Sequence, residues 1–427
     1  MSRILTEEPR PDPDADIEEI ATSELAVDVT AGEYFRGYLA RLRGGDTGLL
    51  PVIIGLVAIA IVFGSLSGAF LTPGNFANLL VQGAPYMLMA MAAVFVLLLG
   101  EVDLSLGFVA GVAAVTCAVL ASKGWPWWAA CLAALVVTTL IGLLQGVIVA
   151  RVGVPSFVVT LAGFLGWQGV MLLVLGNGGT IPVNSQTIFN FANGLLAPWV
   201  GWLFYAIAAV AFVAVELTNW RRRRASGLAS RPTPVVVLRI LVVLVVGAIV
   251  VWLCNIDRGS VNPIEGVPWV VPIVLGVLLL WTFLMTRTRF GRYVYAVGGN
   301  AEAARRAGVK LAFVRTTIFG LAGLTTGMAG LMFLSRLNSI STSFDGGIYV
   351  LYAIAGAVIG GTSLFGGRGK IIHGVLGALV IAGIDNGMGL LSVSAASKYV
   401  VTALVLLAAV SIDAIARRGR AGHGLAA

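Results

Sequence analysis

Long apolar runs recur from residue 48 to residue 415, and they constrain the fold more than any other feature of this chain. A helix rises about 1.5 Å per residue, so about 20 apolar residues cross the roughly 30 Å hydrocarbon core of a bilayer. Hydrophobic residues make up 58% of the 427 residues and charged residues only 11%. Soluble domains carry about 25% charged residues, and no soluble fold buries so large an apolar share. We therefore expect an all-α polytopic membrane protein.

The apolar windows between polar breaks predict about twelve transmembrane helices within a membrane domain that covers residues 47-418. The 54 glycines agree with this prediction, because helices in lipid pack through small residues that let their backbones approach. The expected spans are residues 48-70, 78-100, 104-122, 125-150, 155-175, 199-217, 235-254, 269-286, 314-336, 349-366, 371-391 and 398-415.

The distribution of lysine and arginine predicts which side of the membrane each loop faces. If the N-terminus is cytoplasmic, alternating spans place 24 of the 28 basic residues inside. Cytoplasmic loops retain Lys and Arg, so the bias favours an even number of spans with both termini cytoplasmic. We interpret the run Arg221 to Arg224 as a topology anchor that contacts anionic lipid, rather than as a nucleic-acid site. The four basic residues expected outside are Lys123, Arg258, Arg336 and Lys398.

The two ends of the chain differ from the membrane domain. Residues 1-46 hold 11 of the 20 acidic residues, and we expect them to form an acidic, disordered cytoplasmic head. This head lacks the basic start and short apolar core of a cleavable signal peptide, so the first membrane signal is the span near residue 50. Residues 419-427 are expected to form a cytoplasmic tail.

Residue types that perform catalysis are scarce. Two histidines are present, and the three cysteines show no metal-ligand spacing, so we predict no metal site, disulfide or redox role. The chain contains no Gly-x-x-x-x-Gly-Lys-Ser/Thr loop, and the nearest match, Gly366-Gly-Arg-Gly-Lys370, lacks the required spacing. We therefore expect no catalytic residues, no cofactor and no ATPase site in this chain.

The most polar stretch of the membrane region, residues 287-313, predicts a short helix with its own start and stop. Asn300 is a good N-cap, and Glu302 lies in the first turn, where the helix dipole favours an anion. Arg305 lies near the other end, and Gly308 suits the left-handed terminating position. The small residues expected to enter a groove on another protein are Ala301, Ala303, Ala304 and Ala307.

Within this helix, Glu302-Ala303-Ala304-x-x-x-Gly308 is similar to the Glu-Ala-Ala loop of bacterial ABC importer permeases. That family uses the loop as a coupling helix, which is seated in a cleft of the ATPase subunit. The longer string Gly298-Gly-Asn-Ala-Glu-Ala-Ala-Arg-Arg-Ala-Gly-Val309 resembles the ribose and xylose permease version. The alternative is a capped helix that only packs on the bundle. The resemblance assigns the ATPase-coupling loop to Asn300, Glu302, Ala303, Ala304, Arg305 and Gly308.

Three further motifs resemble the same family. Gly100-Glu-Val-Asp-Leu-Ser-Leu-Gly107 resembles its Gly-Gly-Ile-Asp-Leu-Ser-Val-Gly, and Val154-Pro-Ser-Phe-Val-Val-Thr-Leu161 resembles its Pro-Ser-Phe-x-x-Thr-Leu. Ile359-Gly-Gly-Thr-Ser-Leu-Phe-Gly-Gly-Arg-Gly369 resembles its glycine-rich segment before the penultimate span. The resemblance covers roughly residues 48 to 418. Relative to a ribose permease, the chain has additional length, including the pair of spans around Arg221 to Arg224, and in this it resembles the xylose-type branch. Glu101, where the family commonly has glycine, is a departure that leaves the sugar open.

Charged and polar residues at membrane depth indicate candidates for the translocation path, because each needs a partner or water. Asp103 and Ser105 lie in a glycine-bounded break, where freed backbone groups must be satisfied by protein or by a wet cavity. The alternative for Asp103 is a cap on a helix that begins at Leu104. Asp385 and Asn386 are the other two candidates, with a hydrogen bond inside the bundle as their alternative.

The resemblance implies a type II importer-like bundle that transports a monosaccharide, D-xylose or a related sugar, across the bacterial inner membrane. It implies an ATPase subunit, an extracytoplasmic sugar-binding protein and a permease homodimer as partners, but no nucleic acid. An ion-coupled secondary transporter is the first alternative, with Asp385 as its only good coupling residue. A polytopic membrane enzyme ranks third, because Glu101 and Asp103 are the sole close acidic pair outside the head.

Overall fold

The computed structural model describes residues 50–176, 179–226, 232–259 and 262–405, together with the single residues 32, 36, 407 and 411. The expected tail, and the expected head apart from residues 32 and 36, therefore lie outside the described residues. The chain divides into two compact units. Unit 1 includes Trp202–Val251, and unit 2 comprises Gly45–Gly201 and Trp252–Ala427.

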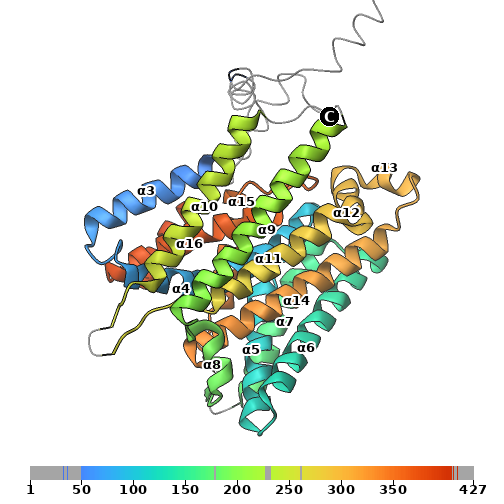
Figure 1. The fold of residues 1–427 in the computed structure, drawn as a ribbon. Helices are drawn as coiled ribbons and strands as arrows, with labels where there is room; N and C mark the ends of the chain where they lie inside the picture. The colour runs from blue at the N-terminus through green and yellow to red at the C-terminus, as the bar shows by residue number, and fades with distance from the viewer. Residues whose placement is uncertain are drawn as a thin grey trace, which may run out of the picture. The chain divides into compact units, whose positions relative to one another are not determined.

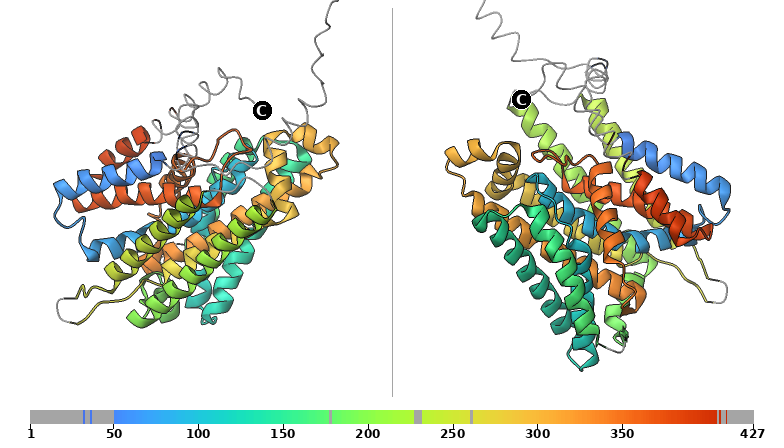
Figure 2. Two further views of the ribbon diagram at one scale, coloured as in Figure 1. Left: turned by 45° about the horizontal axis from the view of Figure 1, so that its top comes forward. Right: turned by 180° about the vertical axis from the view of Figure 1, so that it is seen from behind.

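Unit 2 is a bundle of helices with one small two-stranded sheet (Figures 1 and 2). Its elements are α3 Leu50–Leu66, α4 Pro73–Leu98, α5 Leu106–Ser122, α6 Trp127–Val147, the π-helix η1 Ile148–Val152, α7 Ser156–Leu175, β1 Thr180–Pro182, α8 Gln186–Asn193, α11 Val270–Arg287, α12 Arg289–Gly299, α13 Ala301–Arg306, α14 Leu311–Leu337, β2 Ser339–Ser341, α15 Gly346–Ile359 and α16 Ile371–Leu390. A further apolar helix covers Ala395–Val405.

Unit 1 consists mainly of α9, Pro198–Ala225, and α10, Thr233–Asn255. The two helices run antiparallel. The Tyr205 hydroxyl donates to the Leu244 carbonyl oxygen at 2.7 Å, and Arg239 forms an ion pair with Glu216 at 3.0 Å. These polar contacts join two helices that are mostly apolar before the arginine run at the end of α9.

Each of the first eleven expected spans corresponds to a helix, which confirms the multi-pass helical class. The last expected span, 398-415, begins within the helix Ala395–Val405, and most of its remainder lies outside the described residues. Among the described residues, eight helices are long and apolar enough to cross a membrane, and four apolar helices are shorter. The boundaries differ where local capping decides them. α4 begins at Pro73, five residues before the expected position 78, because the Thr72 side chain accepts a hydrogen bond from Asn75 N–H. Pro73 suits the first turn, where its missing N–H has no helical partner to lose.

Helices α4 and α14 contain the most deeply buried spans of the bundle. Glycines bring α6 and α14 into backbone contact. A Cβ atom added at Gly142 would lie 2.2 Å from the Phe319 carbonyl oxygen, and one added at Gly323 would lie 2.3 Å from the Thr138 carbonyl oxygen. This is the close approach through small residues that the glycine content predicts for helices in lipid.

The expected loop 176-198 contains structure that the sequence did not indicate. β1 pairs antiparallel with β2, and α8 packs at the C-terminal end of α14. The Ser335 hydroxyl accepts from Ala192 N–H at 2.8 Å and donates to the Phe189 carbonyl oxygen at 2.9 Å. Figure 1 shows α8 and α13 at opposite ends of α14.

Candidate coupling helix and translocation path

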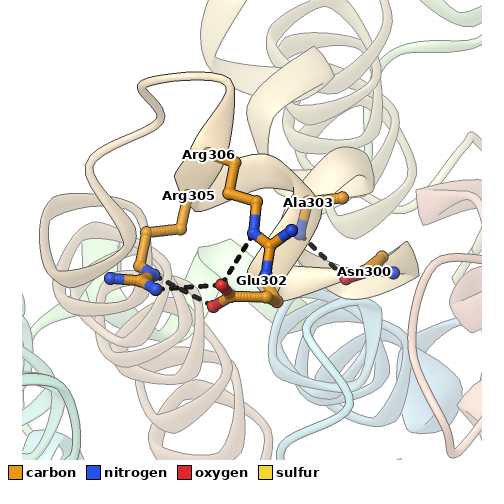
Figure 3. Close-up of polar contacts among 5 residues, drawn as sticks. All are labelled: Asn300, Glu302, Ala303, Arg305 and Arg306. Atoms are coloured by element: carbon orange, nitrogen blue, oxygen red, sulfur yellow. Dashed lines mark hydrogen bonds and ion pairs between the residues drawn. The ribbon is translucent and has the colours of Figure 1, made fainter.

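Helix α13 has the start and stop that the sequence predicts. The Asn300 side-chain oxygen accepts a hydrogen bond from Ala303 N–H at 2.9 Å, and Gly308 has a left-handed φ of +84°. The Glu302 carboxylate accepts hydrogen bonds from Arg305 at 2.9 Å and 3.0 Å and from Arg306 at 3.0 Å (Figure 3). The two ends and the charged side chains are thus satisfied within the nine residues Asn300 to Gly308, and the predicted short helix is confirmed.

The exposed face of α13 is not the all-alanine face that we expected. Ala304 is 5% exposed and faces the bundle, and Ala301 is half-buried. Ala304 is therefore unavailable to a partner. It lies three positions after Ala301, on the same face of the helix, and that face packs on the bundle. The exposed residues are Glu302, Ala303, Arg305, Arg306, Ala307 and Gly308.

The charges on α13 are set by its own ion pairs. Hydrogen bonds from Arg305 and, secondarily, Arg306 lower the pKa of Glu302 below its usual value. The same carboxylate raises the pKa of Arg305. Glu302 and Arg305 are thus both charged at neutral pH.

The segment just before α13 packs into a contact that we name the glycine junction: Leu98, Gly100, Gly298, Gly366 and Gly367. Gly367 N–H donates to the Leu98 carbonyl oxygen at 2.9 Å. A Cβ added at Gly298 would lie 1.8 Å from that same oxygen, and one added at Gly366 would lie 2.8 Å from the Gly100 nitrogen. Only glycine permits this packing, which joins the ends of α4 and α12 to the segment between α15 and α16.

Two side-chain contacts extend the glycine junction. The Tyr295 hydroxyl of α12 donates to the Gly369 carbonyl oxygen at 2.9 Å. Glu101, which follows α4, forms an ion pair with Arg315 of α14 at 3.4 Å. The sequence indicated Glu101 as a departure from the family pattern but did not indicate its partner, because the two residues are 214 positions apart in the chain.

The break after α4 is also held by the first turns of α7. Val102 N–H donates to the Ser156 hydroxyl at 3.3 Å, and the Thr160 hydroxyl donates to the Val102 carbonyl oxygen at 3.2 Å. The freed backbone groups of a broken membrane helix are satisfied here by hydroxyl groups from another helix. The four sequence motifs that resemble the same permease family therefore meet in one region of the structure.

Asp103 and Ser105 lie together in a buried cluster. The Asp103 carboxylate accepts from the Ser105 N–H at 2.8 Å and from the Ser105 hydroxyl at 2.6 Å. Gln145 of α6, which the sequence did not indicate, donates its amide N–H to the same hydroxyl at 2.9 Å. The structure corrects the expected cap: α5 begins at Leu106, and Asp103 binds the amide of the residue before it.

Asp385 lies in a second cluster, between α16 and α4. Its carboxylate accepts from the Gln82 amide at 2.6 Å and from the Tyr86 hydroxyl at 3.0 Å. Lys398 lies 3.6 Å from the other carboxylate oxygen. The negative charge at membrane depth is therefore compensated inside the bundle, as its cost in lipid requires.

Asn386 belongs to this second cluster through amide contacts. Its amide N–H group donates to Asn75 at 3.0 Å and to Gln82 at 3.1 Å, and Asn75 donates back at 2.8 Å. The structure thus pairs Asp385 with Asn386, and Asp103 with Ser105, in two separate clusters. Their roles in translocation stay predictions. Within the described residues, no group of three His, Cys, Asp or Glu residues is placed to hold a metal ion.

Comparisons with known proteins identify the family. The family described as branched-chain amino acid transport system / permease component matches residues 75–410. The xylose transport system permease protein XylH of Escherichia coli is 37% identical over 92% of this chain and 97% of the relative, and that of Haemophilus influenzae is 36% identical over 85% and 96%. The ribose import permease protein RbsC of Escherichia coli is 31% identical over 84% of this chain and 92% of the relative.

No solved structure matches the chain. The sequence relatives cover nearly the whole membrane region, including the four motifs and both polar clusters. The match and the apolar helices agree on a multi-pass protein of the bacterial inner membrane. The chain therefore belongs to the branched-chain amino acid transport system permease family.

Proposed function

We propose that this chain is the permease subunit of an ATP-driven monosaccharide importer and that it carries D-xylose or a related sugar. The names of the similar proteins, which are permeases for xylose, ribose and D-allose, support a sugar as the substrate. The observation that carries the coupling to ATP hydrolysis is α13, a capped and exposed helix attached to the glycine junction. The chain forms the path, and ATPase subunits supply the energy.

Coupling follows from how α13 is attached. Its exposed Ala303 and Ala307 are small enough to enter a cleft, and Arg305 and Arg306 provide charge around them. A movement of the bound ATPase displaces α12 and α13 together, because Gly298 leaves no free space against the Leu98 carbonyl oxygen. The displacement reaches the end of α4, and with it the break that contains Asp103. Packed elements transmit such shifts because they are not continuously deformable.

The proposed topology places twelve helices across the membrane, with both chain ends and α13 in the cytoplasm. The retention of Lys and Arg in cytoplasmic loops supports this orientation. The α8 and β1–β2 region then faces outward and offers a docking surface for a sugar-binding protein. A homodimer of the permease, two ATPase subunits and the binding protein complete the importer, and ATP is used by the ATPase subunits alone.

The alternative, an ion-coupled secondary transporter, needs an ionisable residue that exchanges its ion during transport. Asp385 is the only residue that we proposed for this role, and Lys398 already compensates its charge. This contact favours a structural role for Asp385. Uptake that survives ATP depletion and collapses with an ionophore would support the alternative.

The deciding experiment is uptake of radiolabelled D-xylose into proteoliposomes. The permease reconstituted with its ATPase and sugar-binding protein is expected to accumulate sugar only when ATP is present. D-ribose and D-allose in place of D-xylose identify the preferred sugar. Uphill uptake by the permease alone, without a nucleotide-hydrolysing subunit, would refute the proposal.

A further inference from the structure

A groove between α6 and α7 of unit 2 does not belong to either the glycine junction or the second polar cluster. Its volume is about 360 Å³, within the range of small-molecule sites, which is roughly 300–1,000 Å³. Most of its walls are apolar. The lining residues are Leu144, Gln145, Ile148, Val154, Val158, Val159, Ala162, Gly163 and Trp167.

The floor of the groove carries two polar groups that converge on Gly163. A Cβ added at Gly163 would lie 2.4 Å from the Gln145 amide nitrogen and 3.2 Å from the Trp167 indole nitrogen. Gln145 is 4% exposed, and its amide is held by Ser105 of the Asp103 cluster. The glycine therefore keeps open the space in front of an amide whose position is fixed from behind.

The indole N–H of Trp167 is buried and has no hydrogen-bond partner in the described structure. A buried donor without a partner is costly, so a ligand with an oxygen acceptor is favoured at this point. The amide of Gln145 can donate and accept, as a hydroxyl group does. An acyl chain of a lipid fills the apolar walls equally well, but it leaves the indole N–H without a partner.

The backbone is irregular at two places near Gln145. η1, a π-helix, begins three residues after Gln145, and Ile148 from it lines the groove. The break before α5, which holds Asp103 and Ser105, lies directly behind Gln145. Broken helices whose polar groups meet in the bundle are typical of substrate sites in transporters.

We infer that this groove is a contact site for the transported monosaccharide, in which Gln145 and Trp167 bind hydroxyl groups of the sugar. The inference rests on the proposed sugar-import function. The apolar part of Trp167 covers the C–H face of the sugar ring, and Ser105 and Asp103 position the Gln145 amide. The sugar is uncharged, and this site correspondingly offers it amide and indole groups rather than exposed ions.

The first test asks whether water and sugar enter the groove. Ala162 is exposed and lines it, whereas Leu165, also exposed on α7, does not line it. In the full chain, whose three natural cysteines are buried, an Ala162→Cys variant is treated with methanethiosulfonate ethylammonium with and without D-xylose. We expect modification that D-xylose slows at Ala162→Cys and no effect of D-xylose at Leu165→Cys. An unreactive thiol, or equal rates with and without sugar, would overturn the inference.

The second test measures transport by the assembled importer in proteoliposomes. Trp167→Phe removes the N–H group and keeps an aromatic ring, and Gln145→Leu removes the amide at similar size. We expect each to lower D-xylose transported per ATP hydrolysed by about tenfold, the effect of one lost hydrogen bond to a buried group. Trp128→Phe, at an exposed tryptophan of α6 outside the groove, is the matched control and is expected to transport normally.

The outcomes separate the inference from the proposed function. If the natural chain shows no ATP-dependent uptake of any sugar, the proposed function fails. If the natural chain transports D-xylose and Trp167→Phe transports it at the same ratio to ATP, the contact site fails while the importer stands. Size-exclusion chromatography of each assembled variant shows whether a loss of transport is a loss of assembly. If Gln145→Leu does not assemble, the result for Trp167→Phe alone tests the inference.

Discussion

Replacing Gly298 by alanine tests whether the glycine junction connects α13 to the bundle. The new Cβ atom would lie 1.8 Å from the Leu98 carbonyl oxygen and 2.7 Å from the Gly367 nitrogen, whereas real Cβ atoms essentially never come within 3.0 Å of such atoms. The backbone segments must therefore separate by about 1.2 Å, the difference between 3.0 and 1.8 Å. Neither contact is a flexible side chain that can turn away.

The cost of this separation has two parts. Overpacking of a close contact costs about 1–3 kcal/mol. The shift also disrupts the 2.9 Å hydrogen bond from Gly367 N–H to the Leu98 carbonyl oxygen, which contributes about 1 kcal/mol net. We therefore expect Gly298→Ala to destabilise the permease by about 2–4 kcal/mol. Because the junction is loosened, less of the ATPase movement reaches α4, and sugar transported per ATP hydrolysed is expected to fall.

The neighbouring glycine provides the control. A Cβ at Gly299 would meet no atom within 4 Å, so Gly299→Ala is expected to leave stability and coupling unchanged. Stability is measured by thermal unfolding of the detergent-purified permease, and coupling by parallel uptake and ATPase assays on the reconstituted importer. The reasoning is refuted if Gly298→Ala unfolds at the same temperature as Gly299→Ala and transports the same amount of sugar per ATP.

Three further predictions concern other parts of the chain. Ser335→Ala is expected to lower stability by about 1–3 kcal/mol in thermal unfolding, because it removes both hydrogen bonds between the buried Ser335 hydroxyl and α8. Ser339→Ala is expected to be neutral, because the half-buried Ser339 hydroxyl donates to the nearby Leu337 carbonyl oxygen. Asp385→Asn is expected to lower stability by about 1 kcal/mol, because its ion pair with Lys398 is partly exposed. In a double-mutant cycle, adding Lys398→Met to Asp385→Asn is expected to recover part of that loss, and additive effects of the two substitutions would contradict the pairing. The arginine partners of Glu302 lower its pKa, so the Glu302 ion pairs are complete above the ordinary glutamate pKa and are lost only as pH falls through the lowered value. ATPase binding, measured in a pull-down, is therefore expected to stay constant between about pH 6 and pH 8. A decrease in binding on acidification within that range would show that another group titrates.

Features with a local physical cause were predictable from the order of the residues. The spans follow from apolar length, since a helix in lipid must satisfy its backbone within itself and cover the hydrocarbon with apolar side chains. The short helix α13 follows from capping, because Asn300 and Gly308 act within a few residues of their own positions. The resemblance of the four motifs to importer permeases likewise depended on short sequence segments, and it agreed with the family that the comparisons identify.

Contacts between distant segments were not predictable. Ala304 looked like part of an exposed alanine face, but its direction depends on which side of α13 meets the bundle. Gln145 gave no signal in the sequence, because one glutamine in an apolar span becomes a candidate only when Ser105 and Trp167 lie beside it. Asp103 and Asp385 looked alike as charges at membrane depth, yet they belong to different clusters.

The amino-acid sequence by itself thus determined that the chain is a multi-pass helical membrane protein with a capped helix between two late spans. Only the tertiary structure decided that four separate motifs meet, that Glu101 pairs with Arg315, and that a groove with an unpaired indole N–H lies between α6 and α7. The physical reason is that hydropathy and capping act over one helix length. The partners of a buried polar group come from whichever helix is packed against it, and that packing is a property of the whole bundle.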